Sequence, residues 1–193
     1  MLWLMKVDRT VFLPCNYNTI LGYYWREYTG VIPDDAVEGG QAANGLPIYI
    51  GQVLYADKLI PAKIYSNDAK AYFAWNVEQS ATLNVKILCS KYPERFNWVA
   101  TRKNEIHLLT DQHVVSGGYE PGYIMYIGRA QYSGQTLVGK VRAPEKSTTN
   151  LGLFITNEGK QINLETFEIL IYTPNLKEIE MKYCNKRVVV IKE

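Results

Sequence analysis

The sequence predicts an all-β fold of two tandem, antiparallel, β-sandwich-like units with extra strands at both termini. Short runs of alternating apolar and polar residues are separated by turn residues, which is typical of antiparallel sheets. One segment also occurs twice. Gly39-Gly40 precedes a tyrosine-rich strand and Lys63, and Gly117-Gly118 precedes a similar strand and Lys140. A duplication of this size predicts two similar sets of strands.

The tyrosine-rich strand is the best matched part of the duplication. One face has the same character in both copies, with Tyr49, Gly51, Val53 and Tyr55 in the first and Tyr126, Gly128, Ala130 and Tyr132 in the second. We expect this shared face to be the core-facing one. A glycine in the middle of both strands indicates a bulge or a close approach of the backbone.

The order of elements follows from the repeat. We expect an N-terminal β extension at residues 1–23, unit one at 24–92, unit two at 97–174 and a C-terminal β extension at 175–193. Each unit begins near a tryptophan, Trp25 or Trp98, and ends with an apolar strand. The terminal extensions are predicted to form hairpins that pair with each other or with a unit, because exposed sheet edges favour aggregation.

Composition excludes several classes of protein. Of 193 residues, 47% are hydrophobic and 21% are charged, which suits a buried core rather than disorder. The net charge of +2 is too small to indicate nucleic-acid binding. We find no signal peptide and no apolar run near the roughly 20 residues of a membrane span, so a cytoplasmic location is expected. Cys15, Cys89 and Cys184 are most simply free thiols, although one disulfide remains open.

Catalytic and metal-binding motifs receive little support. His107 and His113 are the only histidines, and neither has a cysteine or carboxylate at zinc-ligand spacing. The segment 134–140 matches the G-x-x-x-x-G-K core of a phosphate-binding loop, but Val141 replaces the Ser or Thr and no helix follows. We therefore predict no enzymatic activity, no metal and no cofactor. A hydrolase acting through either histidine is the weakest alternative.

In the second copy, a carboxylate and an ammonium group are expected to lie close together. Tyr119 and Glu120 follow the glycine pair, and Lys140 lies one strand later. A carboxylate that accepts and an ammonium that donates hydrogen bonds suit the vicinal hydroxyls of a sugar, whose apolar face an aromatic ring can cover. The alternative is a surface salt bridge, which contributes little free energy.

Several spaced motifs resemble the DM9 repeat family. Its pattern of P-x-x-A-[VI]-x-G-G, then Y-[IV]-G-R-A-x-Y-x-G, then G-K-[VI] and a closing Y-E-[VI]-L strand is matched in order. The matching segments are 33–40, 126–134, 139–141 and 167–170. The resemblance covers about residues 25–172 in two tandem copies.

This resemblance implies a metal-independent, mannose-type lectin, and we expect a pattern-recognition protein of innate immunity. Useful avidity would need dimerisation or clustering, so a homodimer is the expected assembly. The family's sugar contacts correspond to Glu120 and Lys140 in unit two, with Tyr119 beside them. In unit one, Lys63 is retained, but Gln41-Ala42 replaces the aromatic-acid pair, so Lys63 is expected to lack an acidic partner. Gln41 or Asn44 would then substitute through neutral hydrogen bonds. The alternative function is a protein-binding adaptor or structural protein whose sugar site has decayed.

Overall fold

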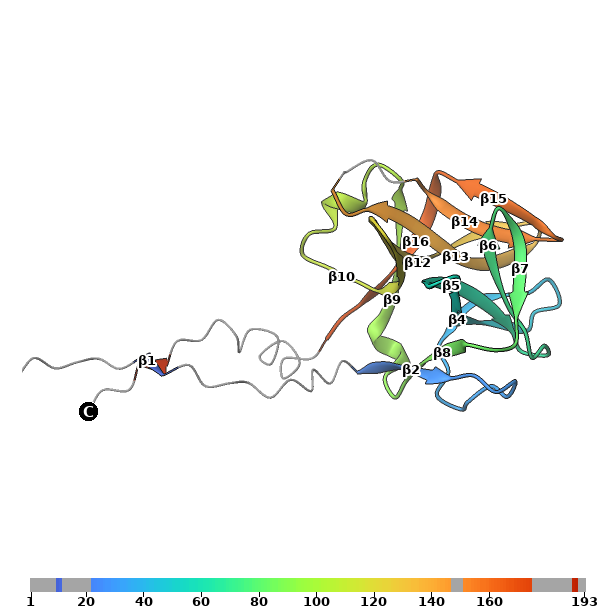
Figure 1. Ribbon diagram of the computed structural model, residues 1–193, viewed down its shortest axis with the longest axis horizontal. Coiled ribbons are helices and arrows are strands. Elements are labelled where there is room, and N and C mark those ends of the chain that lie inside the picture. The colour runs from blue at the N-terminus through green and yellow to red at the C-terminus, as the bar shows by residue number, and fades with distance from the viewer. Residues whose placement is uncertain (1–9, 12–21, 147–150, 175–188, 191–193) are drawn as a thin grey trace, which may run out of the picture. The chain divides into compact units, whose positions relative to one another are not determined.

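The computed structural model describes residues 10–11, 22–146, 151–174 and 189–190 (Figure 1). Its contacts divide the chain into two compact units, Gly22–Thr173 and a second unit of Met1–Leu21 with Pro174–Glu193. In the second unit, β1 (Thr10–Val11) pairs antiparallel with β17 (Val189–Val190). This is one of the two pairings that the sequence left open for the termini. The remainder of the predicted terminal hairpins lies outside the described residues.

The unit Gly22–Thr173 is built of antiparallel strands, which confirms the predicted all-β class. The first repeat contributes β2 (Tyr23–Glu27), β3 (Glu38–Gln41), β4 (Pro47–Tyr55), β5 (Lys58–Tyr65), β6 (Ala71–Trp75), β7 (Val77–Ala81) and β8 (Val85–Ser90). The second contributes β9 (Phe96–Arg102), β10 (His113–Val114), β11 (Ser116–Glu120), β12 (Tyr123–Tyr132), β13 (Gln135–Pro144), β14 (Leu153–Asn157), β15 (Lys160–Leu164) and β16 (Thr166–Tyr172). Two short 3-10 helices, Pro93–Arg95 and Ile106–Leu108, flank β9.

The two repeats pair their strands in the same way. The meander β3–β4–β5 corresponds to β11–β12–β13, and each meander continues into a hairpin, β6–β7 or β14–β15. The closing strand β8 pairs with β4 and β2, just as β16 pairs with β12 and β9. The duplication read from the sequence is therefore a duplication of structure.

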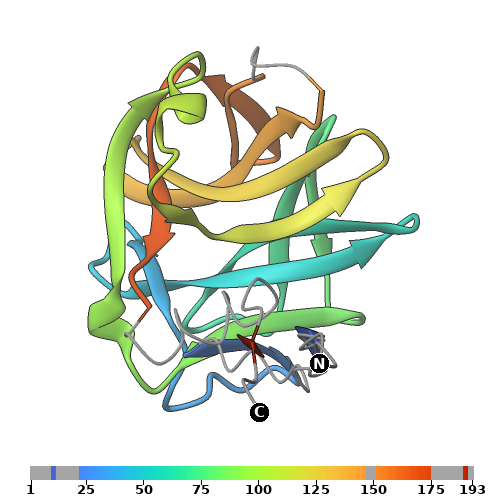
Figure 2. The same ribbon diagram turned by 90° about the vertical axis from the view of Figure 1, so that its left-hand side faces the viewer.

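The repeats share one sheet rather than forming separate lobes. Strand β5 of the first repeat pairs with β11 of the second, and β3 of the first pairs with β13 of the second. Because β12 also pairs with β13, the pairing order β12–β11–β5–β4–β3–β13 returns to its start. Six strands, three from each repeat, thus form a closed ring. Figure 2 shows its two long hairpins, β4–β5 in cyan and β12–β13 in yellow, one above the other.

The paired glycines lie where the repeats meet. A Cβ added to Gly118 would lie 2.0 Å from the carbonyl oxygen of Leu59, and one added to Gly40 would lie 2.0 Å from that of Thr136. Both contacts are with backbone of the other repeat, which only a residue without a side chain permits. The glycine pair in each repeat is therefore needed for the ring to close.

The predicted core face of the tyrosine-rich strand is confirmed in part: Gly51 and Val53 are buried, Tyr55 is exposed, and the opposite face is buried as well. Ile48 and Ile50 are fully buried in one apolar cluster, whereas Val53 on the opposite face is buried in another. The strand β4 thus lies between two clusters and is buried on both faces. The mid-strand glycine that both repeats share causes no bulge in the first repeat, since Gly51 pairs in register with Ala62 and makes room for the side chain of Ile64.

Candidate functional site

A pocket of about 220 Å³ lies where the two repeats meet, and it contains both residues of the predicted acid–base pair. Its lining residues come from five strands and one turn, and they are Trp75, Asn76, Glu120, Lys140, Arg142, Phe154 and Gln161. The tip of the β6–β7 hairpin belongs to the first repeat, and the other residues belong to the second. The volume is below the ~300–1,000 Å³ of drug-sized ligand pockets, so it suits a ligand of about one ring.

Lys140 is held in the pocket by its place in the middle of β13. Its backbone pairs with Ile127 on one side and Phe154 on the other, and only 5% of the residue is exposed. Its Nζ lies 4.9 Å from the ring centre of Trp75 and 5.7 Å from that of Phe154. Within the described part of the chain, no hydrogen bond or ion pair from this Nζ is found. The ammonium is therefore surrounded by aromatic rings and faces the pocket.

Glu120 ends β11 and is also buried, with 4% of the residue exposed. Its Oε1 forms an ion pair with Nε of Arg142, and the guanidinium of Arg142 stacks 3.8 Å from the ring centre of Tyr123. Arg142 lies two residues after Lys140, so both side chains leave the same face of β13. A carboxylate has about four lone-pair positions, and the contact with Arg142 occupies one of them.

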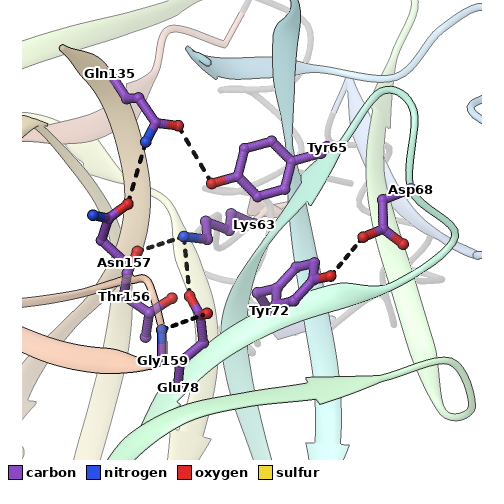
Figure 3. Close-up of polar contacts among 9 residues, drawn as sticks. All are labelled: Lys63, Tyr65, Asp68, Tyr72, Glu78, Gln135, Thr156, Asn157 and Gly159. Carbon is purple, nitrogen blue, oxygen red and sulfur yellow. Dashed lines mark hydrogen bonds and ion pairs between the residues drawn. The ribbon is translucent and has the colours of Figure 1, made fainter. Parts of the chain in front are cut away.

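The corresponding lysine of the first repeat has a different environment (Figure 3). Lys63 is 1% exposed, its Nζ lies 3.2 Å from Oε2 of Glu78, and it donates a hydrogen bond to the carbonyl oxygen of Thr156. Glu78 in turn accepts a hydrogen bond of 3.2 Å from the backbone N–H of Gly159. The prediction that Lys63 lacks an acidic partner is wrong. Glu78 and the strand β14 of the other repeat occupy its polar contacts.

The remaining predicted site residues lie apart from the two lysines' polar contacts. Tyr119 precedes Glu120 on β11 and is 49% exposed, because successive strand residues point to opposite faces. Gln41 donates to the carbonyl of Gly45, and Asn44 accepts from the N–H of Leu46. These two amides stabilise their own turn, and the acidic partner of Lys63 is Glu78.

His107, His113 and Cys89 do not line the pocket. Nε2 of His113 lies 3.0 Å from the hydroxyl of Tyr23, and His107 lies in the second 3-10 helix. Cys89 is a buried free thiol, and burial with the neighbouring Asp35 raises its pKa to about 12. Cys15 and Cys184 lie outside the described residues. In the described ranges no group of three or more metal-ligating side chains occurs. No helix there is long and apolar enough to cross a membrane.

Lys140 should make stability depend on pH. Burial, opposed by Glu120 and aided by Arg142, lowers the pKa of Lys140 from 10.5 to about 8. Between these two values the unfolded chain binds more protons than the folded chain, so the free energy of unfolding rises with pH. We expect a rise on the order of 2–3 kcal/mol from this group. Urea denaturation at pH 7.5 and pH 10 measures it, with Lys140→Met as the reference. An identical pH response in both proteins would contradict the assignment.

Five of the seven lining residues were not foreseen from the sequence. Arg142 could have been found, because it shares a strand face with Lys140 at a spacing of two. Trp75 and Asn76 could not, because they belong to the other repeat and reach the pocket only through the closed ring. Phe154 and Gln161 depend on the register of the β14–β15 hairpin, in which Thr156 pairs with Gln161.

Comparisons with known proteins agree with this architecture. No curated protein matches the sequence. Among solved structures, the nematode sperm cell motility protein MFP2B is similar in fold, with a TM-score of 0.56 and 12% sequence identity. The similarity covers 91% of this chain and 50% of MFP2B, so the chain spans about half the length of that protein.

The family is shown by the sequence itself. The model of the DM9 repeat matches residues 9–69 and 44–153, which together span most of the chain. The two matched regions contain both glycine pairs and both lysines of the closed ring. The chain therefore belongs to the DM9 repeat family.

Proposed function

We propose that this protein binds carbohydrate without catalysis or metal, through the pocket formed by Glu120, Lys140 and Trp75. The observation that carries the proposal is the ammonium of Lys140, which faces the pocket beside a carboxylate and between aromatic rings. The carboxylate accepts from sugar hydroxyls, the ammonium donates to them, and an aromatic ring covers the apolar face of the sugar. The family resemblance favours a mannose-type sugar.

The proposal assigns one sugar site to each chain. Lys63 occupies the equivalent position, but Glu78 and the Thr156 carbonyl already satisfy it. Hydrogen bonds from one small site stabilise a bound sugar only slightly more than its hydrogen bonds with water do. The affinity for a single sugar is therefore expected to be weak. Recognition of a clustered glycan, as in innate immunity, would then rely on avidity from a homodimer. We retain a cytoplasmic location as part of this proposal.

Removing the ammonium should abolish most of the binding. Charge-assisted hydrogen bonds contribute roughly 1.5–3 kcal/mol, so Lys140→Met is expected to weaken binding of methyl α-mannoside about 10- to 100-fold. Isothermal titration calorimetry measures the change. The control is Lys86→Met, which removes an exposed lysine of β8 and should leave the affinity unchanged. If Lys140→Met binds the mannoside as the unmodified protein does, this pocket is not the sugar site.

A second candidate function is a protein-binding or structural role. The observation in its favour is the fold that the chain shares with a protein named for sperm cell motility. Affinity purification should then yield a stoichiometric protein partner, while a glycan array stays blank. Sugar binding that depends on Lys140, with no such partner, would reject this candidate.

A further inference from the structure

The two lysine sites differ in charge as well as in access. In the first repeat, Lys63 is paired with Glu78, and the side chains at the positions equivalent to Arg142 and Glu120 are the neutral Tyr65 and Ala42. In the second repeat, Glu120 is paired with Arg142. The pocket lining thus carries two positive charges, Lys140 and Arg142, against the one negative charge of Glu120.

A single substitution between the repeats accounts for the imbalance. Tyr72 pairs with Lys63, and two residues further along β6, Ala74 pairs with Glu78. In the second repeat, Phe154 pairs with Lys140, and two residues further along β14, Thr156 pairs with Gln161. Gln161 therefore stands at the position of Glu78. The residue that would neutralise Lys140 has the same shape as glutamate but carries no charge.

Within the described residues Lys140 has no ion pair like that of Lys63 with Glu78, because the carboxylate in its pocket, Glu120, is paired with Arg142. Lys63 donates a hydrogen bond to the Thr156 carbonyl oxygen and pairs with Glu78, whereas the direct contacts of the Lys140 Nζ among the described residues are with the rings of Trp75 and Phe154. An enclosed cation without a partner is costly, and an anionic group placed beside it removes that cost. The lowered pKa of Lys140 agrees with this geometry.

We propose that the pocket selects an acidic sugar, one that carries a carboxylate or a phosphate, over the corresponding neutral sugar. The anionic group would lie against Lys140 and the free guanidinium N–H groups of Arg142, at the place that Glu78 takes in the first repeat. The sugar hydroxyls would then donate to Glu120. This inference rests on the proposed sugar-binding function and names the class of its ligand.

The test compares neutral and acidic forms of one sugar. Titration calorimetry with methyl α-mannoside, mannuronate, mannose 6-phosphate and inorganic phosphate separates the sugar from the anion and the carboxylate from the phosphate. We expect at least one acidic sugar to bind about tenfold tighter than the mannoside, which corresponds to ~1.4 kcal/mol. Inorganic phosphate alone should bind more weakly than that acidic sugar.

The matched variant is Gln161→Glu, which changes the charge at constant shape. It should remove the preference for the acidic sugar, because the new carboxylate pairs with Lys140 as Glu78 does with Lys63. Gln161→Met removes the amide without adding charge and should keep the preference.

The outcomes separate the two proposals. If the mannoside and the acidic sugars bind equally, the inference is overturned while the sugar site stands. An unchanged preference in Gln161→Glu also overturns the inference. If no sugar binds, both the sugar site and the acidic-sugar inference are rejected. If inorganic phosphate binds as tightly as mannose 6-phosphate, the pocket recognises the anion alone and the acidic-sugar inference is overturned.

Discussion

Gly118→Ala should lower the free energy of unfolding by about 3 kcal/mol or more, because overpacking at this site meets backbone and not a movable side chain. The new Cβ would lie 2.0 Å from the carbonyl oxygen and 2.7 Å from the carbonyl carbon of Leu59. Relief requires β11 and β5 to separate, and these strands form one of the two junctions between the repeats. Chemical denaturation followed by tryptophan fluorescence measures the loss.

The control is Gly122→Ala, four residues away. Gly122 has φ of +82° and no heavy atom within 4 Å of an added Cβ, so its substitution adds only backbone strain. That strain costs roughly 1–2 kcal/mol for an L-residue. Equal losses in the free energy of unfolding of the two variants would mean that the close approach to Leu59 does not add to the destabilisation.

Glu78→Gln is expected to destabilise the protein by about 3 kcal/mol, since removing one member of a buried ion pair leaves the other charge uncompensated. Glutamine can still accept the hydrogen bond from Gly159, so the variant tests charge and not shape. Burial already lowers the pKa of Lys63, and Glu78 opposes that effect. Without Glu78 the pKa of Lys63 falls further below its unfolded value. The lost stability should therefore return as the pH rises toward 10.5.

A second substitution separates this ion pair from other effects. In Lys63→Met with Glu78→Gln, both charges are absent, and we expect most of the lost stability to be recovered. The control is Glu165→Gln, whose pair with Lys103 lies at the surface with 72% of the Glu165 side chain exposed. That change should cost about 0–1 kcal/mol. A double variant as unstable as Glu78→Gln alone would show that the ion pair is not the cause.

The strands could be predicted from the sequence because their signals are local. The β12–β13 hairpin follows from alternation on both sides of Ser133-Gly134, both of which have the positive φ that a tight turn requires. The pairing between repeats could not be predicted in this way. It joins β5 to β11 and β3 to β13, which are far apart in sequence, and its only local sign is the glycine pair.

The candidate site was predictable only in part for the same reason. Lys140 was found because Lys63 stands at the matching position of the first repeat, and Glu120 was found because it follows the second glycine pair. The ring brings the two to one pocket. Glu78 was missed because it follows Lys63 by 15 residues and reaches it through the β6–β7 hairpin. Gln161 occupies the position of Glu78 in the second repeat. This equivalence can be recognised only when the two hairpins are aligned by their strand register.

The closed ring has a consequence for how such a protein can be assembled. Each repeat has two strands that pair with the other repeat, β3 and β5 in the first and β11 and β13 in the second. By the duplication, the junction β5–β11 is equivalent to the junction β3–β13. A chain that carried a single repeat would meet these requirements with a second copy of itself, related by a twofold axis. In the present chain that symmetry has become internal. The two copies are thereby free to diverge: Lys63 forms an internal ion pair, and Lys140 lines a pocket.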